Sequence, residues 1–85
     1  MTSIERFREV LDESYVWPSM YPFKFIIKLE QKEEIINILT GYDLSFRESK
    51  TGKYLSVNFE INAQSSEEII NIYDKMSSMD NVIKI

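Results

Sequence analysis

Few residues of this chain could carry out chemistry, because none of its 85 residues is cysteine or histidine. These absences exclude disulfides, thiolate nucleophiles, Cys/His zinc sites and the imidazole base that enzymes use most often near neutral pH. Ser49 and Lys50 are the residue types of a Ser/Lys nucleophile pair, but adjacent residues of a strand point to opposite faces. We therefore expect no catalytic residue and no enzyme activity.

Carboxylates are plentiful, but their positions have a structural explanation. The pairs Glu33/Glu34 and Glu67/Glu68 stand where two predicted helices begin, and negative charge there complements the helix dipole. No group of carboxylates has the spacing of an EF-hand or a similar site. We therefore expect no metal site and no cofactor.

A cluster of basic and hydroxyl-bearing side chains is the main candidate for a binding surface. The members are Lys24, Lys28, Arg47, Ser49, Tyr54, Ser56 and Asn58 on one face of the predicted strands, with Lys50 and Lys53 at a hairpin tip. In a chain of net charge −4, a local positive cluster could hold an anionic ligand or an acidic partner surface. The alternative is a solvated face whose basic residues keep edge strands from pairing with other chains.

A group of aromatic residues precedes the first predicted strand. Tyr15, Trp17 and Tyr21, together with Met20, lie within seven positions and resemble the anchor residues of a protein interface. The alternative is that these rings pack internally against the edge of the sheet. Ile26 interrupts the polar face, which predicts that the N-terminal helix, the Trp17 segment or a second subunit covers part of it.

Composition restricts the class of protein further. The chain is 44% hydrophobic and 28% charged, with a pI near 4.8, which is typical of a soluble globular domain. Its acidity argues against nonspecific nucleic-acid binding, which rests on Lys and Arg contacts to phosphates. The apolar runs are too short to span a membrane, so we expect a cytoplasmic protein with no membrane or nucleic-acid partner.

Hydrophobic periodicity predicts three helices and four strands. The predicted helices are 3–13, 32–40 and one that opens at Ser65, and the predicted strands are 23–30, 44–47, 54–62 and 82–85. Thr2 and Ser65 are predicted N-caps, each in a capping box with a glutamate three residues later. The 3.6-residue period predicts that Ile4, Phe7, Val10 and Leu11 are buried in the first helix, and Ile35, Ile36 and Leu39 in the second.

The sequence contains an internal repeat. Residues 33–38 and 67–72 are the same six residues, 34 positions apart, and Phe25 and Ile27 match Phe59 and Ile61 at the same offset. The match predicts one β-α unit that is used twice, and the alternative is chance recurrence in a chain rich in Ile and Glu. With right-handed crossovers and a hairpin between the middle strands, the chain is predicted to be an α+β protein with a ferredoxin-like split βαβ arrangement. Its antiparallel sheet has the order 4-1-3-2 and carries two helices on one face. We assign residues 1–22 to an N-terminal helix and aromatic extended segment, and residues 23–85 to the βαββαβ domain.

Several segments together resemble the YbeD-like family of small bacterial proteins of unknown function. These segments are Trp17-Pro18 ahead of Phe23-Lys24, the hairpin from Glu48 to Val57, and Ile61-Asn62-Ala63 before a helix ending in Ile72-Tyr73. The likeness covers about residues 11 to 85. It implies a ferredoxin-like fold close to that of ACT regulatory domains, but it implies no reaction and no ligand. Many ACT domains bind amino acids at a glycine-bearing loop after the first strand, and residues 29–32 contain no glycine.

The sequence therefore predicts a non-catalytic regulatory or protein-interaction module of ACT-like shape that acts through an unknown protein partner. The alternative is a sensor of an amino acid or another anion, bound near the sheet edge or a dimer interface. The short last strand exposes an edge, so a weak homodimer through that edge or the aromatic segment is also predicted.

Overall fold

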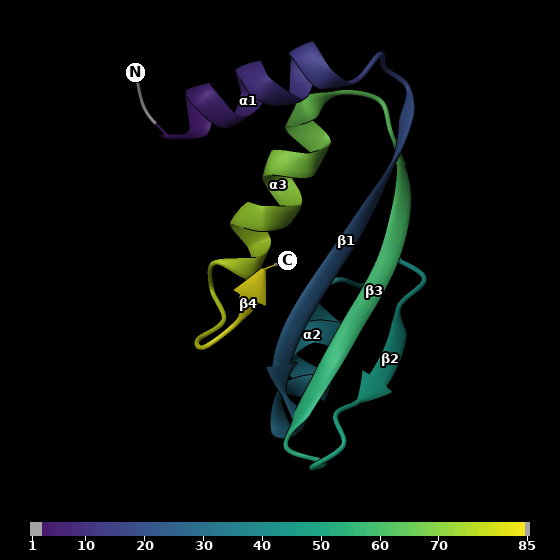
Figure 1. The fold of residues 1–85 in the computed structure, drawn as a ribbon, viewed down its shortest axis with the longest axis vertical. Coiled ribbons are helices and arrows are strands. Elements are labelled where there is room, and N and C mark those ends of the chain that lie inside the picture. Colours follow the sequence, from purple (N-terminus) through teal and green to yellow (C-terminus); the bar gives the residue numbers. More distant parts are fainter. Residues whose placement is uncertain (1–2, 85) are drawn as a thin grey trace.

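The protein is built on a four-stranded antiparallel sheet (Figure 1). The structure is a computed structural model that describes residues 3–84. Its two long strands, β1 (Ser19–Lys28) and β3 (Tyr54–Ala63), pair along their whole length, from Ser19 opposite Ala63 to Lys28 opposite Tyr54. β2 (Ser45–Glu48) pairs with β3, and β4 (Ile83–Lys84) pairs with β1. The order β2-β3-β1-β4 is the predicted order read from the opposite edge.

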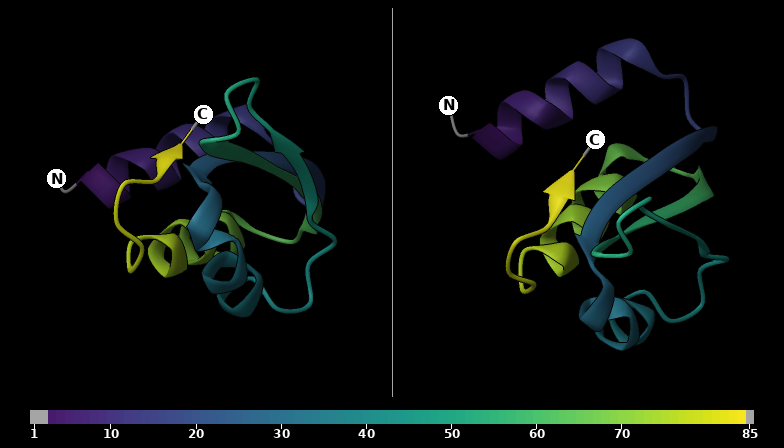
Figure 2. Two further views of the ribbon diagram at one scale, coloured as in Figure 1. Left: turned by 90° about the horizontal axis from the view of Figure 1, so that it is seen from below. Right: turned by 60° about the horizontal axis from the view of Figure 1, so that its bottom comes forward.

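Three α-helices within residues 3–84 accompany the sheet. α2 (Lys32–Ile38), preceded by the single 3₁₀ turn η1 (Leu29–Gln31), and α3 (Ser66–Met76) cover the same face (Figure 2). α1 (Ser3–Ser14) lies across the end of the sheet where β1 begins, against the first part of α3 (Figure 1). No helix within residues 3–84 is long and apolar enough to cross a membrane.

The core lies between the sheet and α2 and α3. Strand alternation sends every second side chain of β1 and β3 to this face, and the helices close over them. Its buried members are Leu11, Phe23, Phe25, Ile27, Ile35, Leu39, Leu55, Val57, Phe59, Ala63, Ile69, Ile70, Ile72, Met76 and Met79. Burying a large apolar side chain contributes about 1.5–3 kcal/mol, so this cluster provides most of what stabilises so small a domain.

Two glycines turn the chain where it needs a left-handed backbone. Gly41 follows α2 with a φ of +95°, and Gly52 lies in the β2–β3 hairpin with a φ of +72°. Residues with a Cβ rarely adopt these angles, whereas glycine does so without steric cost. Gly41 directly follows the predicted helix 32–40, and Gly52 lies in the predicted hairpin between the middle strands.

Four details of the prediction were wrong. β1 begins at Ser19 rather than residue 23, so it crosses the boundary drawn between residues 22 and 23. Ile36 is exposed, and Ile4 and Val10 on α1 are exposed too, so Phe7 and Leu11 alone carry the contact of α1 with the core. Ser65 occupies the N-cap position of α3, but its hydroxyl makes no capping hydrogen bond. The other predicted cap, Thr2, lies outside the described residues.

Replacing Phe59 by alanine tests the packing of this core. The Phe59 ring is 5% exposed and stacks on Phe23 with 4.9 Å between the ring centroids. Phe59→Ala should lower the free energy of unfolding by about 3–5 kcal/mol, because it leaves a cavity as well as losing buried surface. Urea denaturation measures it, and a loss below about 1 kcal/mol would show that Phe59 lies outside the core. Ile36→Ala, at an exposed position, is the control and should change stability far less.

Candidate functional site: the open face of the sheet

The face of the sheet opposite α2 and α3 has no helix over it. Even-numbered residues of β1 point to this side, among them Lys24 and Ile26, while Phe23, Phe25 and Ile27 point to the core. Ile83 of β4 pairs with Ile26 and therefore lies on the same side. We call the surface formed by Lys24, Ile26, Arg47, Tyr54, Ser56 and Ile83 the open face.

The open face contains a hollow of about 460 Å³. Ile26, Ile83 and the ring of Tyr54 form its apolar part, and Ile83 is 55% exposed. Lys24 and Arg47 bring positive charge to it, and Glu48 brings one carboxylate. Apolar surface beside cationic groups suits a ligand or a peptide that carries both apolar and acidic groups.

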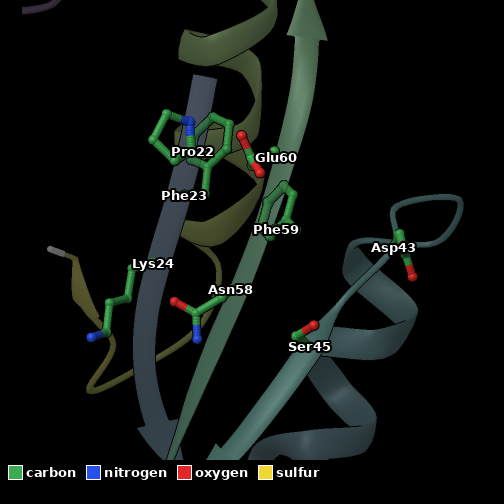
Figure 3. Close-up of a pocket in the computed structure, with 8 residues that line it drawn as sticks. All are labelled: Pro22, Phe23, Lys24, Asp43, Ser45, Asn58, Phe59 and Glu60. Carbon is green, nitrogen blue, oxygen red and sulfur yellow. The ribbon is translucent and has the colours of Figure 1, made fainter. Parts of the chain in front are cut away.

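A second hollow, of about 590 Å³, adjoins the first and shares Lys24 with it (Figure 3). β1 and β3 provide Lys24 and Asn58, while Ser45 and Asp43 come from β2 and the loop before it. Glu60 lies at its other end, so two carboxylates stand on this part of the surface. The positive charge is therefore concentrated toward the first hollow.

The structure brings five of the nine residues of the predicted cluster to the first hollow. Lys24, Arg47, Ser49, Tyr54 and Ser56 line the first hollow. Lys28 and Lys53 line a different hollow of about 410 Å³ near the β2–β3 hairpin, and Lys50 is exposed at the hairpin tip. Asn58 lies in the second hollow and donates a hydrogen bond from Nδ2 to the Ser56 hydroxyl at 3.0 Å.

The hydroxyl of Ser49 has a structural role in the hairpin. It accepts a hydrogen bond from the backbone N–H of Tyr54 at 3.1 Å and lies 3.3 Å from the Thr51 hydroxyl. The backbone N–H of Ser49 in turn donates to the carbonyl of Tyr54 at 2.9 Å. These bonds hold the hairpin that places Arg47 and Tyr54 beside each other on the open face.

Ile83 is the functional candidate that sequence reasoning missed. The sequence contained enough information to find this residue, because the predicted antiparallel pairing of the last strand with the first strand places an isoleucine beside Ile26. The side chain of Gln31 positions the loop before β4. Its Oε1 accepts a hydrogen bond from the Lys28 N–H at 2.9 Å, and its Nε2 donates one to the carbonyl of Asp80 at 2.7 Å. Gln31 thus ties the end of β1 to the loop before β4.

The aromatic residues Tyr15, Trp17 and Tyr21 pack within the chain. Tyr15 stacks on Trp17 and also contacts Tyr21, with 5.4 Å between the centroids in both pairs. The indole N–H of Trp17 donates to Asp12 of α1 at 3.0 Å. This arrangement is the predicted internal alternative, and an interface role for the three rings stays a prediction. Neither α1 nor the Trp17 segment lines the hollow that contains Ile26, and cover of part of the polar face by either one or by a second subunit stays a prediction.

Tyr73 joins this aromatic group to the core. Its ring meets Phe7 edge-on at 5.6 Å and lies 5.3 Å from Phe23. Burial raises the pKa of the Tyr73 hydroxyl well above its usual range, and a hydrogen bond to Tyr21 and the nearby Tyr21 and Tyr15 phenols raise it further. Tyr73 therefore stays protonated in the folded chain at pH values where an exposed tyrosine ionises.

The fold defines a small α+β protein built on a four-stranded antiparallel sheet. Comparison with protein families shows that the chain belongs to DUF493, described as a protein of unknown function, whose family model matches residues 12–85. The resemblance to YbeD-like proteins is consistent with this result. Comparisons with curated proteins and with solved structures gave no match.

The weak homodimer stays a prediction, which sedimentation equilibrium can decide.

Tyr73 makes stability depend on alkaline pH. Because its pKa is higher in the folded chain than in the unfolded one, its contribution is complete below about pH 10, the unfolded value, and is lost as pH rises beyond it. Thermal unfolding followed from pH 8 to 11 should therefore show a smaller alkaline loss of stability in Tyr73→Phe than in the unchanged chain. Equal losses in both proteins would show that Tyr73 does not cause the effect. Tyr54→Phe, at an exposed tyrosine, is the matched control.

Proposed function

We propose that this chain is a non-catalytic, cytoplasmic protein-interaction or regulatory module, and that its open face binds an acidic segment of a partner protein. The observation that carries the proposal is the apolar surface of Ile26, Ile83 and Tyr54 beside Lys24 and Arg47, in a chain whose net charge is −4. Positive charge collected at one place in an acidic protein selects an anionic partner.

The ferredoxin-like, ACT-like arrangement is part of this proposal. Two β-α units, β1-α2 and β3-α3, are joined so that β1 and β3 lie side by side with β2 and β4 outside them. A split βαβ fold of this kind has helices on one face and leaves the other face for a partner. That division supports a binding role for the open face.

The energetics support a protein partner of mixed chemistry. Exposed apolar side chains such as Ile83 provide favourable burial when a partner covers them. Lys24 and Arg47 stand beside this apolar surface, where charges mainly accelerate association and exclude cationic partners. An extended segment that alternates acidic and apolar residues would satisfy both features.

The second candidate is a sensor of a small anion, and the hollow itself favours it. Its volume of about 460 Å³ falls in the range of small-molecule sites, roughly 300–1,000 Å³. Lys24 and Arg47 could hold a carboxylate while Ile26 and Ile83 contact an apolar side chain. A ligand of this kind raises the melting temperature by mass action, so thermal-shift screening of amino acids and dicarboxylates distinguishes the two candidates.

The direct test is a titration of the ¹⁵N-labelled chain with a ten-residue peptide that alternates glutamate and valine. Amide signals of Lys24, Ile26, Arg47, Ser56 and Ile83 should shift, and Lys24→Glu with Arg47→Glu should weaken binding about tenfold or more, as expected for close charge pairs. Arg6→Glu, a single charge reversal on α1 that is the control for each of the two substitutions taken alone, should leave binding unchanged.

Two results would contradict the proposal. Equally strong binding of the same peptide with lysine in place of glutamate would show that charge does not select the partner. Peptide shifts that persist in the Lys24→Glu, Arg47→Glu double variant would place the binding surface elsewhere.

A further inference from the structure

The two copies of the internal repeat form helices that sit on the sheet in the same way. The shared six residues lie in α2 and in α3, each directly after a long central strand. Ile35 of α2 and Ile69 of α3, which are equivalent at the 34-residue offset, are both fully buried. The two helices therefore present equivalent side chains to the core, and their outer flanks can be compared position by position.

The outer flank of α3 is covered by a helix. α1 lies on it, with the Phe7 ring edge-on to Tyr73 at 5.6 Å and the guanidinium of Arg8 paired with the Glu67 carboxylate. Ile4 and Phe7 line one hollow together with Ile70 and Tyr73. Under this cover, Ile70 is only 9% exposed.

The equivalent flank of α2 is open. Ile36, the counterpart of Ile70, is 41% exposed. It lines a hollow of about 320 Å³ together with Thr40, Gly41, Tyr42, Leu44 and Phe46, and Leu39, the counterpart of Tyr73, forms the floor of this hollow at 1% exposure. We call the surface formed by Ile36, Leu39, Tyr42, Leu44 and Phe46 the α2 groove. Glu33, the counterpart of Glu67, is exposed at the start of the same helix.

We infer that the α2 groove binds an amphipathic helix of a partner protein, in the way that α3 binds α1. The partner helix would place an aliphatic and an aromatic side chain, about one turn apart, against the exposed Ile36 and the half-buried Tyr42 and Phe46. It would also direct an arginine to Glu33. Helices recognise grooves through apolar residues at this spacing. The groove lies on the helical side of the molecule, so it is separate from the open face.

A partner helix fits better than α1 of a second copy. α1 already uses Phe7 and Leu11 to cover its own core, and Leu11 is 3% exposed. If α1 moved to the groove of another copy, the apolar surface that it covers in its own chain would become exposed. The exchange would therefore bury no additional apolar surface. Lys32, whose ammonium lies 4.9 Å from the centre of the Phe46 ring, adds a cation at the groove and favours an acidic residue on that side of the partner helix.

The chain's own α1 sequence provides the probe. A synthetic peptide of residues 3–14, acetylated and amidated, is added to the ¹⁵N-labelled full chain at up to millimolar concentration, since helices this short are marginal in water. Because the α3 flank is already occupied by α1, the expected amide shifts lie at Ile36, Tyr42 and Phe46. Ile36→Glu should weaken binding about tenfold, since a charge would then face the apolar side of the peptide.

Charge exchange tests the orientation of the helix. Glu33→Arg should weaken binding of the peptide about threefold, and a peptide carrying Arg8→Glu should recover that loss, as expected for one exposed ion pair. The matched control is Ile83→Glu, the same substitution on the open face, which should leave peptide binding unchanged while disturbing the proposed acidic-partner site. Circular dichroism verifies that each variant is folded.

Three results would overturn the inference. The first is shifts confined to Ile70 and Tyr73, which would mean that the peptide only exchanges with α1. The second is no shift at millimolar peptide. The third is binding that Ile36→Glu does not weaken.

Discussion

The antiparallel register of β1 and β3 is the constraint on which the rest of the structure depends. Pairing runs without interruption from Ser19 opposite Ala63 to Lys28 opposite Tyr54. Because side chains alternate along a strand, a shift of one residue in either strand would exchange its buried and exposed faces. In the observed register, Phe23, Phe25 and Phe59 lie under the helices, while Lys24, Ile26 and Ser56 lie on the open face. The core and the candidate binding surface are thus two results of one alignment.

The internal repeat adds near-symmetry to this sheet, and α1 breaks it. Both repeat helices bury the same isoleucine, but only α3 carries another helix on its outer flank. The family match begins at residue 12, so most of α1 lies before the matched region. The described part of the molecule therefore offers two candidate surfaces: the open face, which is apolar and basic, and the α2 groove, where Ile36 is exposed and Glu33 stands at the start of the helix.

The sequence predicted the strand faces and the sheet order well. Apolar and polar residues alternate regularly along β1 and β3, and the internal repeat indicates that a helix follows each of these two strands. It was less successful where local pattern is weak. α2 has only seven residues and follows a 3₁₀ turn, so the position of Ile36 was decided by packing rather than by helical period. The first strand was predicted to begin at residue 23, yet β1 also includes Pro22, which lies opposite Glu60. Of the candidate site, the cations and hydroxyls were predicted, whereas Ile83 required the pairing of β4 with Ile26.

The most direct test of the division into a buried and an open face is the response of isoleucine methyl signals in NMR spectra to a soluble paramagnetic agent. Ile26 and Ile83 share the open face, whereas Ile35 and Ile69 lie in the core at 0% exposure. We expect strong broadening of the Ile83 methyl signals and clear broadening of those of Ile26, with the Ile35 and Ile69 signals retained. Protection of Ile26 and Ile83 equal to that of Ile69 would show that this face is covered in the free protein and that the division into a buried and an open face is wrong.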